Sequence, residues 1–169
     1  MTSTPTKAVK LSLSLDGAVH AALAAAAYKQ GEVTTRFISQ VLMEYCIQND
    51  LFEGEEKIRA EAMMALVKQV TATARGLVTD GQFAPTITRD AIAVCLEDER
   101  WLADYETFIK GKWHIHGNPL KGAINREMGY QVKRAVRAKV IRDEAGEPLT
   151  EKVSNSAIQS FTLLEPDTE

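Results

Sequence analysis

The chain has 169 residues, a net charge of −3, 45% hydrophobic and 25% charged residues. This composition is typical of a soluble globular protein, and it argues against wholesale disorder, a collagen-like chain or a coiled coil. No apolar run approaches the ~20 residues that span a bilayer, and Cys46 and Cys95 lie outside any CxxC spacing. We therefore expect a cytoplasmic protein with no membrane contact, in which any nucleic-acid binding must rest on local rather than overall charge.

The first patterned segment is KLSLSL, residues 10–15, in which polar and apolar residues alternate strictly. The alternation puts three leucines on one face and Lys10, Ser12 and Ser14 on the other. It predicts a short strand, preceded by a flexible arm over residues 1–9. A lone strand leaves its backbone unpaired, and no other strand-like run lies nearby. We therefore expect it to pair with the same strand of a second copy of the chain.

Two helices are predicted directly after this strand. Asp16 is a good N-cap, and the alanine-rich run that follows continues to Gly31, which has the character of a C-cap. A second helix is expected after Glu32, with Thr34 or Thr35 as its N-cap. Its apolar residues recur at three- and four-residue spacings, and they are Phe37, Ile38, Val41, Leu42, Tyr45 and Cys46.

The rest of the chain is predicted to be helical with a terminal hairpin. Apolar periodicity and capping residues indicate helices over Glu53–Gly76, Arg89–Ile109 and Ala123–Ala138. Two short strands, Lys139–Arg142 and Ala157–Leu164, are expected to form a hairpin turned by EAGEP.

A short alternating strand, a helix, a turn with glycine and a second helix follow one another in KLSLSLDGAVHAALAAAAYKQGEVTTRFISQVLMEYC. This segment resembles the ribbon-helix-helix pattern of the Arc, CopG and MetJ class of DNA-binding proteins. The resemblance covers about a third of the chain and rests on the order of the elements. It implies an intertwined dimer in which two strands form an antiparallel ribbon that enters the major groove of DNA.

The resemblance also implies which residues contact DNA. Lys10, Ser12 and Ser14 would face the bases, and the start of the second helix, at Val33, Thr34 and Thr35, would anchor phosphates. The chemistry is compatible, since lysine can donate to guanine O6 and N7 and a serine hydroxyl suits several base edges. The alternative is a strand and two ordinary helices inside an α/β core, with the serines merely exposed.

A second candidate feature is the basic stretch from Lys110 to Arg142. It contains nine Lys or Arg residues against one acid, a local net charge of +8. This stretch could contact phosphates or a single strand. Alternatively, it is a solvated helix that pairs with the acidic segment Glu97–Glu106. The candidate nucleic-acid contacts within it are Lys121, Arg126, Lys133, Arg134 and Arg137.

The sequence offers little sign of metal or enzyme chemistry. His114 and His116 could point the same way and, with Cys95, ligate nickel, copper or zinc, as in metal sensors built on the module that the N-terminus resembles. No third and fourth ligands are evident, however, and an HxH beside Gly117 is more typical of a turn. Because no nucleophile–base pair, glycine-rich phosphate loop or carboxylate dyad is present, we expect neither an enzyme nor a cofactor.

Together these features predict a mainly α protein. A ribbon-helix-helix dimer would occupy residues 10–52, and a helical or α+β domain, ending in the hairpin, would occupy residues 53–169. The predicted function is that of a sequence-specific transcriptional regulator of plasmid or phage type that binds double-stranded DNA as a homodimer. The alternatives are an accessory DNA-binding protein of a plasmid partition or conjugative relaxosome complex, with a protein partner on the C-terminal domain, and a metal-responsive regulator.

Overall fold

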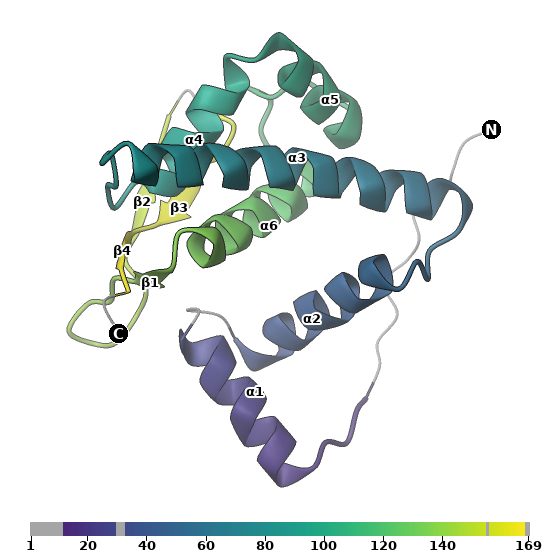
Figure 1. Ribbon diagram of the computed structural model, residues 1–169, viewed down its shortest axis with the longest axis vertical. Helices are drawn as coiled ribbons and strands as arrows, with labels where there is room; N and C mark the ends of the chain where they lie inside the picture. Colours follow the sequence, from purple (N-terminus) through teal and green to yellow (C-terminus); the bar gives the residue numbers. More distant parts are fainter. Residues whose placement is uncertain (1–11, 30–32, 155, 168–169) are drawn as a thin grey trace.

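The computed structural model describes residues 12–29, 33–154 and 156–167, which form six helices and four short strands (Figure 1). The elements are, in chain order, α1 (Gly17–Lys29), α2 (Thr34–Gln48), α3 (Gly54–Thr79), α4 (Ile87–Leu96), α5 (Glu99–Ile109), α6 (Pro119–Ala135), β1 (Ala138–Val140), β2 (Thr150–Lys152), β3 (Ser160–Thr162) and β4 (Leu164–Pro166).

The predicted N-terminal strand is absent from the described residues. Residues 12–16 are neither helix nor strand, Ser12 and Ser14 are exposed, and Leu13 is 59% exposed rather than buried. Lys10 and the predicted arm over residues 1–9 lie outside the described residues. The described strands pair only with one another near the C-terminus, so nothing in the described chain stabilises a strand at residues 12–16. The ribbon-helix-helix fold and its intertwined dimer were therefore a wrong prediction.

The two N-terminal helices were predicted correctly. The Asp16 carboxylate accepts a hydrogen bond from the backbone N–H of Ala18 at 2.8 Å, which caps the start of α1. Helix α2 begins at Thr34, and its N-cap residue is Val33 rather than the predicted Thr34 or Thr35, because Val33 is the extended residue that precedes the helix; no side chain caps it. The predicted stop of α1 at Gly31 lies outside the described residues. Figure 1 shows α1 at the bottom of the molecule, where it packs against α2.

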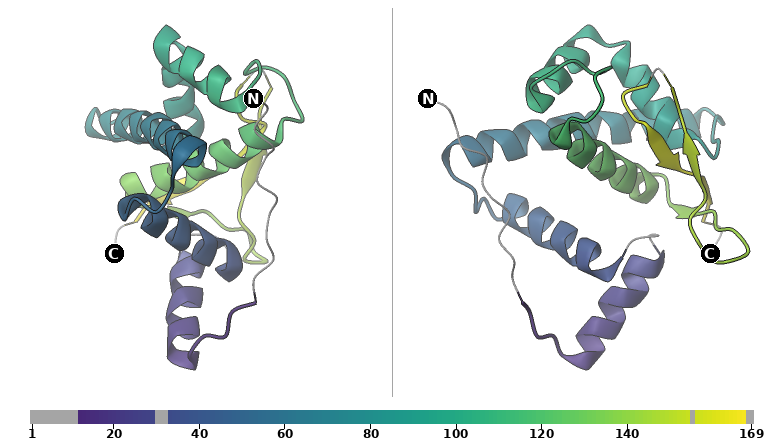
Figure 2. Two further views of the ribbon diagram at one scale, coloured as in Figure 1. Left: turned by 90° about the vertical axis from the view of Figure 1, so that its right-hand side faces the viewer. Right: turned by 180° about the vertical axis from the view of Figure 1, so that it is seen from behind.

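The main core lies between α3, α4, α5, α6 and the C-terminal strands. Figure 2 shows that α3 crosses the molecule with α6 on one side and α4 and α5 on another. Trp101 and Tyr105 of α5 are fully buried and stacked, with ring centroids 5.0 Å apart. The Trp101 indole N–H donates to the carbonyl of Leu66 in α3 at 3.3 Å. This hydrogen bond, together with the burial of both rings in a core shared with α3, holds α5 on α3.

The predicted continuous helix Arg89–Ile109 is in fact two helices, α4 and α5. Asp98 adopts an extended conformation, and its carboxylate accepts hydrogen bonds from the backbone N–H groups of Arg100 and Trp101 at 2.9 and 3.1 Å. A side chain that caps a helix in this way competes with continuation of the preceding helix. The chain therefore turns at residues 97–98 and brings Trp101 onto the core.

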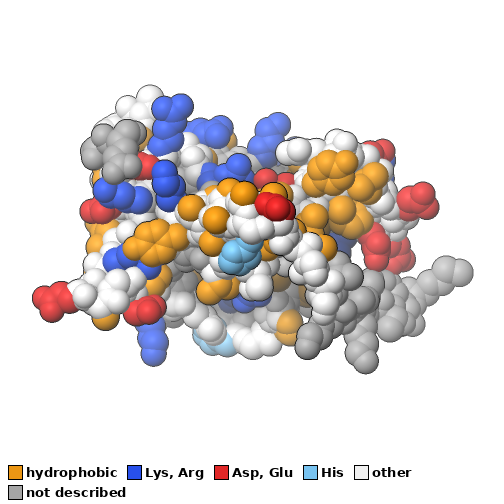
Figure 3. Space-filling model, turned by 90° about the horizontal axis from the view of Figure 1, so that it is seen from below, with side chains coloured by type: hydrophobic (Ala, Val, Ile, Leu, Met, Phe, Trp, Pro, Cys, Tyr) orange, Lys and Arg blue, Asp and Glu red, His pale blue; other side chains and the backbone are white. Residues whose placement is uncertain are grey.

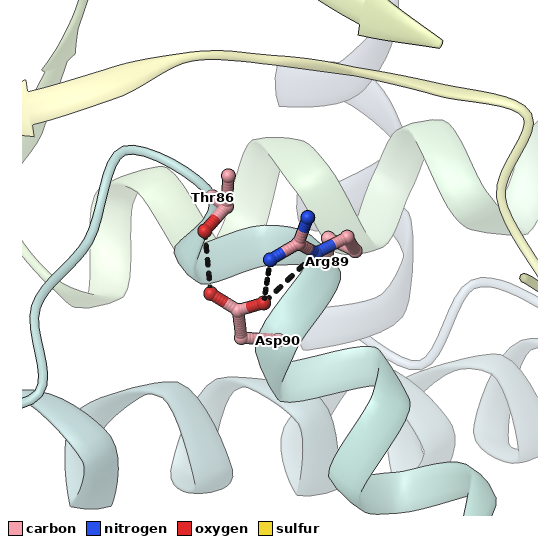
Figure 4. A network of polar contacts seen from close by, with 3 residues as sticks. All are labelled: Thr86, Arg89 and Asp90. Atoms are coloured by element: carbon pink, nitrogen blue, oxygen red, sulfur yellow. Dashed lines mark hydrogen bonds and ion pairs between the residues drawn. The ribbon is translucent and has the colours of Figure 1, made fainter. Parts of the chain in front are cut away.

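Thr86, Arg89 and Asp90 form a polar network at the start of α4 (Figure 4). The Thr86 hydroxyl donates to one Asp90 carboxylate oxygen at 2.6 Å, and Arg89 Nε and Nη2 donate to the other at 2.9 and 2.7 Å. The Arg89 guanidinium also lies 5.7 Å from the ring centroid of Phe161 in β3. The network thus links α4 to the C-terminal strands.

Helix α6 begins earlier than predicted. Asn118 caps it by accepting hydrogen bonds from the backbone N–H groups of Leu120 and Lys121, and Pro119 occupies the first turn, where its missing N–H has no cost. Beyond α6, β1 pairs antiparallel with β4, and β2 pairs antiparallel with β3. The predicted single hairpin is therefore two small two-stranded sheets.

Candidate nucleic-acid interface

A cavity of about 420 Å³ lies between α6, the first turn of α2 and the strands β2 and β3; we call it the α6 cleft. Among the described residues that line it, none is acidic and four are Lys or Arg. These four are Arg36, Lys121, Arg126 and Lys133. The polar lining residues with uncharged or imidazole side chains include His116, Asn118, Asn125, Thr150, Gln159 and Ser160.

The spacing of residues along α6 builds one wall of the cleft. Gly122, Arg126, Gly129 and Lys133 recur at three- and four-residue intervals, so they lie on one side of the helix. A Cβ atom at Gly122 would lie 3.3 Å from Arg126 Nη1, so the glycine leaves room for the guanidinium. From Lys121 to Lys133 this wall extends about 18 Å along the helix axis, at about 1.5 Å per residue.

Lys121 is the most deeply buried of these cations, with 5% of its surface exposed. Its ammonium donates hydrogen bonds to the carbonyl oxygens of Trp113 and Ile115, the latter at 3.2 Å. Burial lowers the pKa of Lys121 from its ordinary value, because removal from water penalises the charged form. These two partners are neutral, so they give the ammonium no compensating negative charge.

Lys133 and Arg134 are neighbours in sequence but have different surroundings. Lys133 lines the cleft, is 6% exposed and has its ammonium 5.9 Å from the centroid of the Tyr130 ring. Arg134 forms an ion pair of 2.7 Å with Glu44 in α2. Arg137 follows the end of α6, is exposed and has a positive φ of 50°. Of the five predicted contacts in the basic stretch, three line the cleft and two, Arg134 and Arg137, do not.

The predicted phosphate site at the start of α2 adjoins the cleft but does not line it. Val33, Thr34 and Thr35 do form the beginning of the helix, as the sequence predicted. The lining residue is the next one, Arg36. The sequence reasoning missed Arg36, although a cation beside a predicted helix N-terminus was a signal that could have identified it. Ser12 and Ser14 are not among the lining residues, and Lys10 lies outside the described part of the chain.

The two candidate metal-binding histidines have other contacts. His116 lines the cleft, and its Nδ1 lies 2.7 Å from Gln159 Nε2. His114 packs edge-on against Trp113, and Cys95 is buried with its sulfur 3.4 Å from the Thr73 hydroxyl. Within the described residues, no group of three or more His, Cys, Asp or Glu side chains is placed to hold a metal ion.

The acidic segment Glu97–Glu106 does not cover the basic stretch as the alternative prediction required. Lys112 does pair with Glu106, at 2.7 Å. Arg134 and Lys139, however, pair with Glu44 and Glu165, which lie outside that segment. No acidic residue of α5 is among the described residues that line the α6 cleft.

Comparisons with protein-family models, curated proteins and solved structures find no match to this chain. None of the helices in the described ranges has both the length and the apolar character required to cross a bilayer. The function is therefore inferred from the cleft, which offers positive charge and N–H donors on two converging helices.

Proposed function

We propose that this is a cytoplasmic DNA-binding regulatory protein that holds the phosphate backbone through the α6 cleft. The observation that carries the proposal is a cluster of four cations, Arg36 from α2 with Lys121, Arg126 and Lys133 from α6, without an acidic residue among the described lining residues. The two more exposed cations, Arg36 and Arg126, would contact the backbone, and the buried Lys121 and Lys133 would add to the positive potential of the cleft. Positive charge gathered on the walls of a cleft raises the local electrostatic potential and attracts anions. A nucleic-acid backbone supplies several closely spaced anions, and Lys and Arg are the side chains that commonly contact it.

Backbone contacts position a protein on DNA, whereas base contacts provide sequence specificity. Gln159 and Ser160 are exposed residues at the rim of the cleft, on the strand side. A side-chain amide can pair with adenine and a hydroxyl can bond to several base edges, so these two residues are the best placed to add sequence preference. This assignment replaces Lys10, Ser12 and Ser14 as the proposed base-reading residues.

Self-association through a second surface is part of the proposed function. Val41, Leu42 and Tyr45 of α2 are exposed, as are Leu51 and Ile58 around the start of α3. Figure 3 shows hydrophobic side chains exposed at the upper right, on the side where α2 ends and α3 begins, and Lys and Arg side chains gathered at the upper left. An exposed group of large apolar side chains is typical of a protein–protein contact, and a second copy of the chain would cover it.

The dimer is tested by light scattering after size-exclusion chromatography. Leu42→Glu and Tyr45→Glu together place charge on this surface and should convert a dimer to a monomer. Lys68→Glu, an exposed change on α3, is the control. A wild-type protein that is monomeric at all concentrations would contradict self-association and leave the DNA proposal intact.

DNA binding is tested by fluorescence anisotropy with a short labelled duplex at several salt concentrations. The double variant Arg36→Ala, Arg126→Ala should bind at least about tenfold more weakly. Its plot of log affinity against log salt should be shallower by about one for each phosphate that the variant no longer binds. Lys68→Ala removes one positive charge away from the cleft, half the change of the double variant, and should have little effect. Equal reductions of affinity in the cleft variant and the control would show that only overall charge matters and would overturn the proposal.

A further inference from the structure

The end of the α6 cleft formed by His116, Asn118, Lys121 and Gly122, at the start of α6, differs from the rest of the cleft; we call it the Lys121 end. Here the cation is 5% exposed, whereas Arg126 is exposed and Arg36 is half-buried. A double helix is far too wide to enter a cavity of about 420 Å³. DNA that lies on the rim can therefore reach Arg126 and Arg36, while only a small group can reach Lys121.

The electrostatics of Lys121 favour a doubly charged group. Its two hydrogen bonds go to neutral carbonyl oxygens, and an ammonium carries three N–H donors. A buried cation is costly to hold unless a negative charge accompanies it. A phosphate monoester carries close to two negative charges at neutral pH and has three strong acceptor oxygens. It compensates a buried lysine better than a phosphodiester, which carries one charge.

The rest of the cleft can accommodate the sugar and base to which a phosphate monoester is attached. Its volume lies within the range of about 300–1,000 Å³ that is usual for small-ligand sites. Ala157, Ile158 and Leu164 add buried apolar side chains to its lining, and Gln159 adds an exposed amide. A phosphate held at Lys121 would therefore place an attached sugar and base along the α6 wall, toward Arg126 and Lys133.

We propose that the Lys121 end binds a terminal phosphate monoester on a nucleotide. The nucleotide can come from two sources, a free mononucleotide or the phosphorylated end of a nucleic-acid strand. The strand-end source rests on the proposed DNA-binding function, whereas the mononucleotide source does not. Binding involves no covalent change: Lys121 and Arg126 donate hydrogen bonds to the phosphate oxygens, and the base lies against the strand side of the cleft.

The test compares matched ligands on the full-length protein by anisotropy and competition. One labelled single-stranded oligonucleotide is prepared with a 5′-phosphate, with a 3′-phosphate and with hydroxyls at both ends. A nucleoside 5′-monophosphate, the nucleoside alone and inorganic phosphate serve as competitors. We expect at least one phosphorylated end to raise affinity by about tenfold, as charge-assisted hydrogen bonds to a terminal phosphate would. The monophosphate should compete better than inorganic phosphate, and the nucleoside should not compete.

Two variants test whether the preference for a phosphorylated end depends on the Lys121 end of the cleft. Lys121→Met removes the buried charge and retains a long apolar side chain, and it should abolish the preference for the phosphorylated end. Because Lys121 also bonds to the loop carbonyls, this variant is checked by its melting temperature. Arg126→Ala, at an exposed position, gives an independent measurement if Lys121→Met does not fold. Lys68→Ala should keep the preference.

The outcomes separate this inference from the proposed function. Oligonucleotides that bind equally well with and without terminal phosphates, together with no competition by the monophosphate, would overturn the inference while the DNA-binding proposal stands. Binding of the monophosphate in the absence of any oligonucleotide or duplex binding would support the inference and overturn the DNA-binding proposal. No binding of the monophosphate, of the oligonucleotides or of the duplex would overturn both.

Discussion

The α1–α2 pair and the body from α3 to β4 differ in how completely their apolar side chains are buried. In the body, Ile92, Tyr105 and Ile124 are fully buried. In the pair, Ala27 and Phe37 are buried together with Tyr130 of α6, while Tyr45 remains 58% exposed. Both parts have regular helices with apolar stripes. The difference shows that an apolar stripe becomes a core only where enough neighbouring elements surround it.

Beside the small apolar cluster with Tyr130, polar contacts join the two parts in the described residues. The Glu44 carboxylate accepts hydrogen bonds from Gln131 and Arg134 of α6, each at 2.7 Å. At the other end, the Arg142 guanidinium lies 4.6 Å from the centroid of the Tyr28 ring in α1 and donates to the Tyr28 carbonyl at 3.2 Å. Regions with few buried apolar contacts open at low free-energy cost, so we expect the pair to open before the body unfolds.

The largest expected effect comes from the core of the body. Trp101→Ala removes a buried indole, its stacking on Tyr105 and its bond to the Leu66 carbonyl. The free energy of unfolding should fall by about 4 kcal/mol. Urea denaturation followed by circular dichroism measures it. A decrease below about 1 kcal/mol, well under the usual cost of such a truncation, would show that the body is not the more stable part.

An alkaline titration tests the same core. Burial raises the pKa of Tyr105 to about 12, although its hydrogen bond to Asn125 acts in the opposite direction. The unfolded chain ionises near a pKa of about 10 and the folded chain only near the higher value, so stability is intact below pH 10 and declines above it, by about 1.4 kcal/mol per unit. Tyr105→Phe should remove this decline in denaturation curves collected across the interval. An unchanged slope in that variant would assign the decline to other groups.

A smaller effect is expected for the corresponding truncation in the pair. Phe37→Ala removes the largest buried side chain that α1 and α2 contribute to their small cluster with Tyr130. Because few side chains surround it, the cost should be about 2 kcal/mol, below the range for a fully enclosed phenylalanine. Hydrogen exchange should show faster exchange confined to α1 and α2. Equal acceleration in α3 and α6 would mean that the two parts unfold as one cooperative unit.

The smallest effect concerns the polar contact between the parts. Glu44→Ala removes the acceptor shared by Gln131 and Arg134, and both ionic side chains are partly exposed. The expected decrease in stability is about 0.5–1 kcal/mol. It should appear in exchange from α2 and not in the urea midpoint of the body. Glu53→Ala, an exposed acid before α3, is the matched control and should leave α2 unchanged.

Local signals made the helices predictable, whereas the N-terminal strand depended on a distant partner. Asp16 and the alanine run define α1 within one segment of sequence, and α1 forms as expected. KLSLSL has strand periodicity, but periodicity does not supply a pairing strand, and Ser12 and Leu13 are exposed outside any sheet. The break at Asp98 was missed for a related reason, since the capping aspartate lies among good helix formers and the burial of Trp101 decides the geometry.

The candidate site was predictable in its charge and not in its shape. Counting Lys and Arg identified Lys121, Arg126 and Lys133, all of which line the cleft. Nothing local separates Lys133 from Arg134, because the difference comes from Glu44, ninety residues earlier in the chain. Arg36 joins the site because of the way α2 packs on α6, which is a property of the folded chain.

The absence of a side chain at Gly122 leaves space in the cleft for the Arg126 guanidinium. A methyl group there would lie 3.3 Å from the Arg126 guanidinium, closer than an ordinary contact, and would push that flexible side chain outward. A single added carbon would therefore move a positive charge without removing it. Across descendants of this chain, substitution at position 122 offers a route by which ligand preference can diverge while net charge, core and fold stay the same.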